Sequence, residues 1–205
     1  MKIERVDLIH IAVPLIHPFR TSFGEISKQD SVIVRVHGDG LIGYGEVSPG
    51  FRPIYSYETV ETVWHILRDF IAPAILHKQV ASTEDLLNEL AFIRGHNIAK
   101  AGVEIAFWNL LARREGKPLG KLLGGVKTKV PAGVSIGIQR SISELVDRIE
   151  NFLDEGYQRI KIKIEPGWDI NVVEQVQDKF PDIVLMVGCQ CGIYFGRRGK
   201  VQKAG

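Results

Sequence analysis

The chain has 205 residues, of which 45% are hydrophobic and 24% are charged, and this composition is typical of globular domains. No apolar run approaches the roughly 20 residues that a membrane-spanning helix requires, so the sequence predicts no membrane protein. The N-terminal stretch has charges among its apolar residues and no small-residue cleavage site. We therefore expect a strand there, no signal peptide and a cytoplasmic location.

The net charge of +2 comes from the C-terminal tail, residues 188–205. These residues include four Lys or Arg and no Asp or Glu, and the rest of the chain has 22 basic against 24 acidic residues. A positive charge confined to such a tail gives no support for nucleic-acid binding. The tail also contains five glycines and both cysteines, and it has no helical or strand periodicity.

Two interpretations of this aberrant basic tail stay open. It can be a flexible extension, as many proteins have. Alternatively, the reading frame shifts after residue 187. Codons for Asp-Ala-Asn-Ala-Ala-Tyr-Thr, preceded by one extra G, translate as Gly-Cys-Gln-Cys-Gly-Ile-Tyr, which is the sequence of residues 188–194. We favour the frameshift, and resequencing the gene tests it.

Residues 1–125 predict an α+β domain that begins with strands. Residues 2–13 alternate charged and apolar side chains, as a half-buried strand does. Residues 14–30 contain two prolines and a glycine and predict a loop, and residues 31–47 predict a hairpin that turns at 37–40. Val32, Val34 and Val36 share one face of that hairpin, and a second loop follows over residues 47–57.

Helices complete this predicted domain. Apolar spacing predicts a helix over residues 57–70, and the acidic stretch from Ser82 to Asp85 predicts the start of another. Residues 99–116 predict a third helix, since they end in basic residues and a glycine. Strands followed by helices are typical of the α+β class.

Residues 126–187 have a different pattern, in which strands and helices alternate. Strands are predicted at 129–138, 157–166 and 182–187, and helices at 142–156 and 169–180, with Asp169 as the cap of the second helix. This βαβαβ alternation with short connections predicts a parallel sheet.

The strongest candidate for chemistry is the pair Lys161 and Lys163 in the second of these strands. Residues i and i+2 of a strand lie on the same face, so both lysines point one way and the neighbouring isoleucines point the other. In a closed parallel barrel the lysines would face the interior near the mouth, where active sites lie. Burial and mutual repulsion lower a lysine pKa and allow it to act as a base. The alternative is an edge strand whose lysines face solvent and discourage aggregation.

Five segments of the chain form a set that is more specific than any one of them: PFRTSFG (18–24), GYGEVSP (43–49), GHNIAKAGVEIAFWNLLARREGKPLGKLLGG (95–125), GVSIGI (133–138) and KIK (161–163). Together they resemble the enolase superfamily, in its muconate-lactonizing-like subgroup, close to the o-succinylbenzoate synthases and N-acylamino acid racemases. The similarity covers residues 1–187. Asn109 departs from the aspartate frequent in the family, at what we interpret as a structural position.

This resemblance implies a capping domain followed by the first part of a modified (β/α) TIM-like barrel. It also implies abstraction of the proton α to a carboxylate, with a divalent metal such as Mg²⁺ and a small carboxylate substrate in an intact homo-oligomeric enzyme. Lys163 would be the base, and Lys161 would hold the carboxylate. Ser135 would line the pocket, or else satisfy backbone groups at the strand end.

Loop residues of the capping domain would contribute the rest of the site. Phe19, Phe23 and Tyr55 would exclude solvent, or simply pack the loops on the barrel. Arg20 would meet an anionic group of the substrate, or remain an ordinary surface arginine.

The family takes its acidic metal ligands from later barrel strands, and Gly188 stands where the first of these aspartates is expected. We therefore expect this chain to be inactive, to bind no Mg²⁺ at that site and to fold poorly alone. Activity as o-succinylbenzoate synthase in menaquinone synthesis, as N-acylamino acid racemase, or as a muconate cycloisomerase or dipeptide epimerase relative remains open. A non-catalytic binding or interaction fragment is the alternative of another class.

Overall fold

The computed structural model describes residues 1–22 and 24–189, which form two compact units. The first unit contains Met1–Leu15 and Lys28–Thr128. The second unit contains Ile16–Ser27 and the residues from Lys129 onward. Each unit has its own cluster of buried hydrophobic residues.

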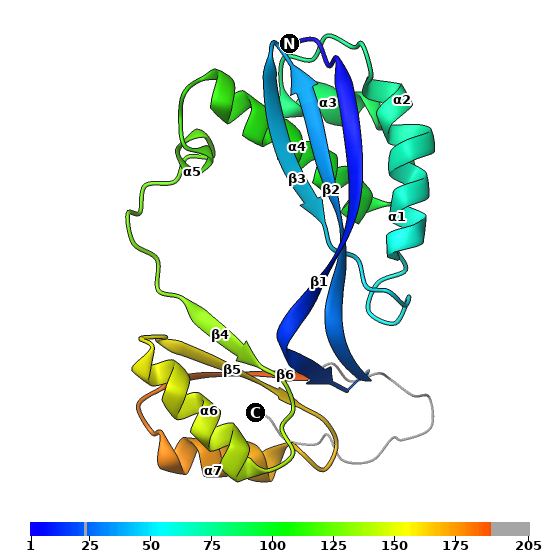
Figure 1. Cartoon of the computed structure of the whole chain (residues 1–205). Coiled ribbons are helices and arrows are strands. Elements are labelled where there is room, and N and C mark those ends of the chain that lie inside the picture. The colour runs from blue at the N-terminus through cyan, green and yellow to red at the C-terminus, as the bar shows by residue number, and fades with distance from the viewer. Residues whose placement is uncertain (23, 190–205) are drawn as a thin grey trace. The chain divides into compact units, whose positions relative to one another are not determined.

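Three strands form the sheet β1-β2-β3, which runs through the first unit (Figure 1): β1 is Arg5–Thr21, β2 is Gly24–Gly38 and β3 is Leu41–Val47. The predicted apolar face of the hairpin is confirmed, because Val32, Val34 and Val36 are fully buried. The turn between β2 and β3 is formed by Asp39 and Gly40, whose φ values of 51° and 72° are those of a two-residue hairpin turn.

The loop predicted over residues 14–30 is wrong. Strand β1 continues through Pro14 and Pro18 to Thr21, and β2 begins at Gly24. Because β1 is an edge strand of its three-stranded sheet, a proline there removes no hydrogen bond from a central ladder.

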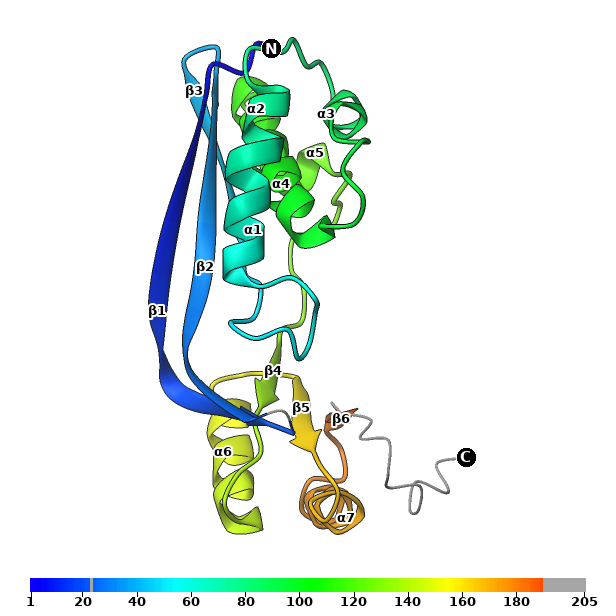
Figure 2. The same cartoon turned by 90° about the vertical axis from the view of Figure 1, so that its right-hand side faces the viewer.

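Helices cover one side of this sheet, with α1, α2 and α4 beside it in Figure 2. The helix predicted over 57–70 begins later, at Val60, where the side chain of Thr59 caps it, and it continues through a π-helical turn to Ile75. The predicted start at Ser82 is confirmed by a capping box with Asp85. The helices of this unit are α1 (Val60–Ile66), the π-helix η1 (Leu67–Ile71), α2 (Ala72–Ile75), α3 (Thr83–Glu89), α4 (Asn97–Arg114) and α5 (Leu119–Leu122).

Glycines allow α4 to lie directly against strand β3. A β-carbon at Gly43 would collide with the carbonyl oxygen of Ala106, and one at Gly45 would collide with the carbonyl oxygen of Gly102. A β-carbon at Gly102 would in turn collide with Val47. Helix backbone and strand backbone therefore touch without intervening side chains, which fixes the position of α4 on the sheet.

The second unit contains the predicted parallel sheet, in the order β4-β5-β6. Both strand pairs are parallel, and the isoleucines of β5 face the helices, which confirms the predicted βαβαβ pattern. Asp169 caps α7 as predicted, because its carboxylate accepts a hydrogen bond from Ile170 N at 2.8 Å. The elements are β4 (Gly133–Ile136), α6 (Ile142–Asp154), β5 (Arg159–Ile164), α7 (Ile170–Lys179) and β6 (Val184–Cys189).

The strand bounds differ from the prediction, and the strand expected over 157–166 is limited to Arg159–Ile164. The strand expected over 129–138 is limited to the four residues of β4. Strand β6 does not end at residue 187, since it pairs with β5 as far as Cys189. The first two residues of the predicted tail are thus part of the sheet, and residues 190–205 lie outside the described part of the chain.

The core of the second unit lies between the sheet and its two helices. Ile160 and Ile162 are fully buried, and they pack with Leu145 and Ile149 of α6 and with Val172 of α7. Over residues 1–22 and 24–189, no helix combines the length and the hydropathy that crossing a membrane requires.

Candidate active site

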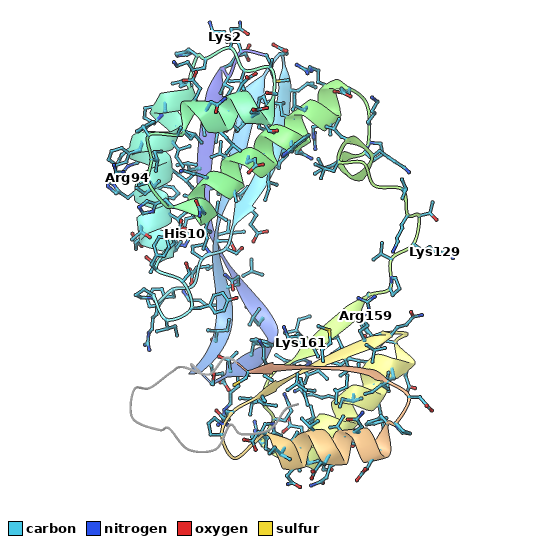
Figure 3. The ribbon with its side chains drawn as sticks, turned by 180° about the vertical axis from the view of Figure 1, so that it is seen from behind. Lys2, His10, Arg94, Lys129, Arg159 and Lys161 are labelled. Carbon is cyan, nitrogen blue, oxygen red and sulfur yellow. The ribbon has the colours of Figure 1, made fainter. Side chains whose placement is uncertain are left out.

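Strand β5 presents two lysines on the face of the sheet that is turned away from the helices. Ile160 and Ile162 point into the core between sheet and helices, so Lys161 and Lys163 point to the opposite face because side chains alternate along a strand. Figure 3 labels Lys161 on this face, opposite α6 and α7. Lys163 lies one residue before the carboxyl end of the strand.

The register of the parallel sheet brings further residues onto the same face. Ser135 of β4 lies opposite Lys161, and Met186 of β6 lies opposite Lys161 on its other side. Gly188 of β6 lies opposite Lys163. Three of the positions singled out from the sequence, Ser135, Lys161 and Lys163, thus share one surface.

The two lysines differ in their surroundings. Lys163 retains only 8% of its exposed surface, whereas Lys161 is half-buried and Ser135 is exposed. Burial is the larger cause that lowers the pKa of Lys163 below its ordinary value of 10.5, and the positive charge of Lys161 adds to it. Neither lysine has a hydrogen bond or an ion pair with another residue of the described part of the chain.

Gly188 lies between the two lysine side chains. A β-carbon at this position would be 2.8 Å from Lys161 Cε and 3.4 Å from Lys163 Nζ. The side chains of both lysines therefore converge over the glycine, in space that any larger residue would have to share. A side chain at position 188 would point at the amine of Lys163.

The same face offers no ligand set for a divalent metal. Gly188 has no donor atom on a side chain, and no group of three or more His, Cys, Asp or Glu within residues 1–22 and 24–189 could hold an ion. Mg²⁺ is bound through carboxylates and other oxygens, so the residues described here do not fit it.

The end of the β1–β2 hairpin belongs to the same unit and contacts the end of β4. Ile138 N donates a hydrogen bond to Arg20 O at 3.0 Å, and a β-carbon at Gly137 would lie 3.4 Å from the ring of Phe19. Arg20 Nη2 is 3.1 Å from Glu165 Oε1, in an ion pair whose arginine is 48% exposed. Glu165 was not among the predicted site residues, although it follows Lys163 by two positions in the sequence.

The other two predicted loop residues are not placed with this group. Phe23 lies outside the described residues. Tyr55 belongs to the first unit, where it lies in the loop after β3 with 77% of its surface exposed.

Asn109 stands where the resembled family often has aspartate, and its hydrogen-bond partners lie within the first unit. Its side-chain oxygen accepts hydrogen bonds from Tyr44 N at 3.1 Å and from Arg113 Nε at 3.2 Å. It therefore links helix α4 to strand β3, which is a structural role.

Comparison with known protein families identifies the family to which this chain belongs. Residues 5–124 match the family described as mandelate racemase / muconate lactonizing enzyme, N-terminal domain. The chain therefore belongs to the mandelate racemase / muconate lactonizing enzyme family, and its structural neighbours are members of the enolase superfamily. This confirms the capping domain and the incomplete barrel expected from the sequence.

The curated relatives include an o-succinylbenzoate synthase and an N-succinylamino acid racemase. The chain is 43% identical to an o-succinylbenzoate synthase of Geobacillus stearothermophilus over 187 residues, covering 91% of this chain and 50% of that protein. It is 40% identical to an N-succinylamino acid racemase of Thermus thermophilus over 185 residues, covering 90% of this chain and 50% of that protein. The chain thus spans about half the length of the curated relatives that it matches.

Solved structures of related enzymes have the same fold over nearly all of this chain. A member of the enolase superfamily from Listeria innocua superposes with a TM-score of 0.85 at 34% identity, covering 91% of this chain and 51% of that one. A dipeptide epimerase from Enterococcus faecalis, solved with Mg and the dipeptide L-Leu-L-Tyr, superposes with a TM-score of 0.84 at 27% identity, covering 93% of this chain and 54% of that one.

Proposed function

We propose that residues 1–187 are the front half of an enzyme that removes the proton α to a carboxylate, of the o-succinylbenzoate synthase or N-succinylamino acid racemase kind. The observation that supports this most is the pair Lys161 and Lys163 on the face of the sheet turned away from the helices. Lys163 is buried there and has a lowered pKa. The names of the relatives support the same chemistry.

In this proposal Lys163 is the base. Its neutral amine accepts the α-proton at Nζ, and the lowered pKa raises the fraction of amine that is neutral near physiological pH. The amine of Lys161 attracts the substrate carboxylate, and its positive charge helps to lower the pKa of Lys163. Ser135, opposite Lys161 in the register, lines the substrate side of the sheet.

The hairpin residues have a supporting role in this proposal. Phe19 lies against Gly137, where it excludes water from the end of β4. Arg20 is held by Glu165, so it first positions the hairpin and meets an anionic substrate group only if that ion pair opens. Tyr55 and Phe23 remain candidates for lining the pocket.

The chain by itself is proposed to be catalytically inactive. The enediolate formed by proton removal needs a concentrated positive charge beside the carboxylate, which a divalent metal supplies in this superfamily. Gly188 provides no donor for such an ion. We expect calorimetric titration of the chain with Mg²⁺ to give no stoichiometric binding, and tight binding would contradict this.

A chimera tests the proposed function. Residues 1–187 of this chain are joined to the second half of the Geobacillus o-succinylbenzoate synthase, which starts from the residue aligned with position 188 of this chain. The chimera should exchange the α-proton of an N-succinylamino acid with deuterium in D₂O. The same chimera with Lys163→Ala should lose the exchange by a factor of about 10³ or more, since an essential base is removed.

The matched control for this chimera is Lys179→Ala. Lys179 is an exposed lysine of α7 that pairs with Glu150, so its removal should leave the exchange rate unchanged. A folded chimera whose exchange rate is unaffected by Lys163→Ala would refute the assignment of the base.

A further inference from the structure

The tip of the β1–β2 hairpin, residues 16–22 and 24–27, belongs to the second unit together with the parallel sheet. We propose that Glu165 is a positioning residue, which docks this hairpin tip on the carboxyl ends of β4 and β5. Figure 1 shows the ends of β1 and β2 beside the parallel sheet. The docking itself is independent of the proposed function, whereas its consequence for a substrate rests on that function.

The hairpin tip has few apolar contacts that could hold it in place. Ile16 is 94% exposed and Ile26 is 46% exposed. Phe19 is only partly buried, and none of the described residues of the tip is fully buried. A segment with so little buried apolar surface opens easily, so its polar contacts decide whether it stays docked.

The first of these contacts is made by the backbone of Arg20. Ile138 N donates a hydrogen bond to Arg20 O at 3.0 Å, and a β-carbon at Gly137 would lie 2.9 Å from the same oxygen and 3.0 Å from Arg20 N. Gly137 is not among the glycines with positive φ, so its missing side chain serves this close approach and not the local backbone. The main chain of Arg20 is thus fixed beside the end of β4.

The second contact is the ion pair between Arg20 Nη2 and Glu165 Oε1 at 3.1 Å. Glu165 lies in a tight turn, because its N–H donates to Trp168 O at 3.1 Å and Trp168 N donates to Glu165 O at 2.8 Å. Exposed ion pairs usually contribute little, since two long side chains must be ordered. Here both backbones are already fixed, so less conformational entropy is lost when the pair forms.

The position of Glu165 gives this docking its consequence. Glu165 directly follows β5 and comes two residues after Lys163, so the tip is held at the carboxyl edge of the sheet, where the proposed base lies. Phe19 then lies against Gly137. Glu165 acts through the tip and contacts no substrate in this proposal, which makes it a positioning residue and not a catalytic one.

Hydrogen exchange of the full 205-residue chain at low salt tests the docking. The Ile138 amide is the reporter, because its N–H donates to Arg20 O and its exchange follows the population of the opened tip. Glu165→Gln should raise this exchange rate about two- to fivefold, the range expected for an exposed ion pair. The amides of the central strand β5 should not change. In about 1 M salt the wild type should exchange at Ile138 as fast as the variant.

Three further variants define the outcome. Glu150→Gln is the matched control, since it breaks the exposed ion pair with Lys179 in the same unit and should leave Ile138 unchanged. The charge exchange Arg20→Glu with Glu165→Arg should restore slow exchange. Gly137→Ala, whose methyl group would meet the backbone of Arg20, should raise the rate about tenfold. An Ile138 rate that Glu165→Gln leaves unchanged, or that changes together with the amides of β5, would overturn the proposal.

The consequence for a substrate is measured in the chimera with the Geobacillus second half. Glu165→Gln should raise KM for the N-succinylamino acid several-fold and leave kcat within about twofold, because an undocked tip encloses the substrate less well while the base stays in place. An active chimera with unchanged KM would refute the positioning role. A chimera that is inactive with Glu165 intact would contradict the proposed function, and docking measured by hydrogen exchange would still stand.

Discussion

The two units bury their sheets to different extents. In the first unit, helix α4 lies against the backbone of β3, and residues such as Val34, Phe107 and Leu110 are fully buried between them. In the second unit, Ile160 and Ile162 are equally buried on the helix side of the sheet. On the lysine side, however, Val184 is 56% exposed and Met186 is 49% exposed.

This difference shows which part of the structure is complete in itself. The first unit forms a layered core from its own elements, as an α+β domain does. The second contains three parallel strands, whereas an eight-stranded barrel fills its interior with side chains from all of its strands. Helices cover only one face of the sheet in each unit, but the uncovered face of the second sheet exposes Val184 and Met186, so we expect the second unit to be the less stable one.

The largest effect should come from the backbone contact that holds the first unit together. In Gly45→Ala the new methyl group would collide with Gly102 O of α4. We expect a loss of about 4 kcal/mol or more, because neither backbone can move aside without separating the helix from the sheet. Urea unfolding followed by Trp64 and Trp108 fluorescence measures it.

The control for that substitution is Gly120→Ala in α5, where a β-carbon would meet nothing within 4 Å. It should leave the unfolding midpoint almost unchanged. Comparable losses in both variants would mean that α4 does not depend on the glycine contact.

Two substitutions on opposite faces of the second sheet measure how much each face contributes to stability. Ile162→Ala removes a fully buried side chain and should cost about 2–4 kcal/mol. Met186→Ala removes a half-exposed side chain of the lysine face and should change stability by less than about 0.5 kcal/mol. Trp168, which packs against this core, reports both. A large loss for Met186→Ala would indicate that something covers the lysine face.

The cap of helix α4 is a smaller and more local contribution. Glu58 is buried, and its carboxylate accepts hydrogen bonds from Ile98 N at 2.9 Å and Ala99 N at 3.1 Å. Glu58→Ala would leave one buried and one partly buried donor unsatisfied at a helix N-terminus, at a cost of about 1–3 kcal/mol. Thermal unfolding detects the loss, and the exposed Glu61→Ala serves as the matched control. Equal melting temperatures for both variants would be inconsistent with a capping role.

Local patterns predicted the elements well wherever the determinants are close in sequence. The alternation in β5 placed Lys161 and Lys163 on one face and the isoleucines on the other. The acidic stretch from Ser82 to Asp85 predicted a helix start, and the structure has a capping box there. The strand through Pro14 and Pro18 was missed because tolerance for proline depends on β1 being an edge strand, which local sequence does not reveal.

Contacts between residues that are distant in the sequence could not be predicted from local patterns. The ion pair of Arg20 with Glu165 joins residues 145 positions apart, and the contact of Gly137 with the hairpin depends on how two separate segments meet. The position of Gly188 between the lysines required the exact register of β5 and β6. Such placements come from tertiary packing and leave no periodic signal in a single sequence.

The smallest predicted effect is the pH dependence that Lys163 contributes to stability. Because its pKa is lowered in the folded state, the unfolded chain binds more protons between that lowered value and the ordinary pKa of 10.5. Stability should therefore rise with pH in this window, and at neutral pH the buried charge is a cost. Lys163→Met removes that cost, so the variant should be more stable than the wild type at neutral pH, by less than about 1 kcal/mol.

The advantage of Lys163→Met should shrink as the pH rises through the lowered pKa of Lys163, because the wild-type lysine then becomes neutral in the folded state. Urea midpoints followed by Trp168 at neutral and alkaline pH measure this change. Lys179→Met is the control, since Lys179 is exposed and paired with Glu150 and should show no stabilisation at neutral pH. A difference between Lys163→Met and wild type that stays constant with pH would mean that the lysine is fully charged across the range, which would also remove the electrostatic basis for its role as a base.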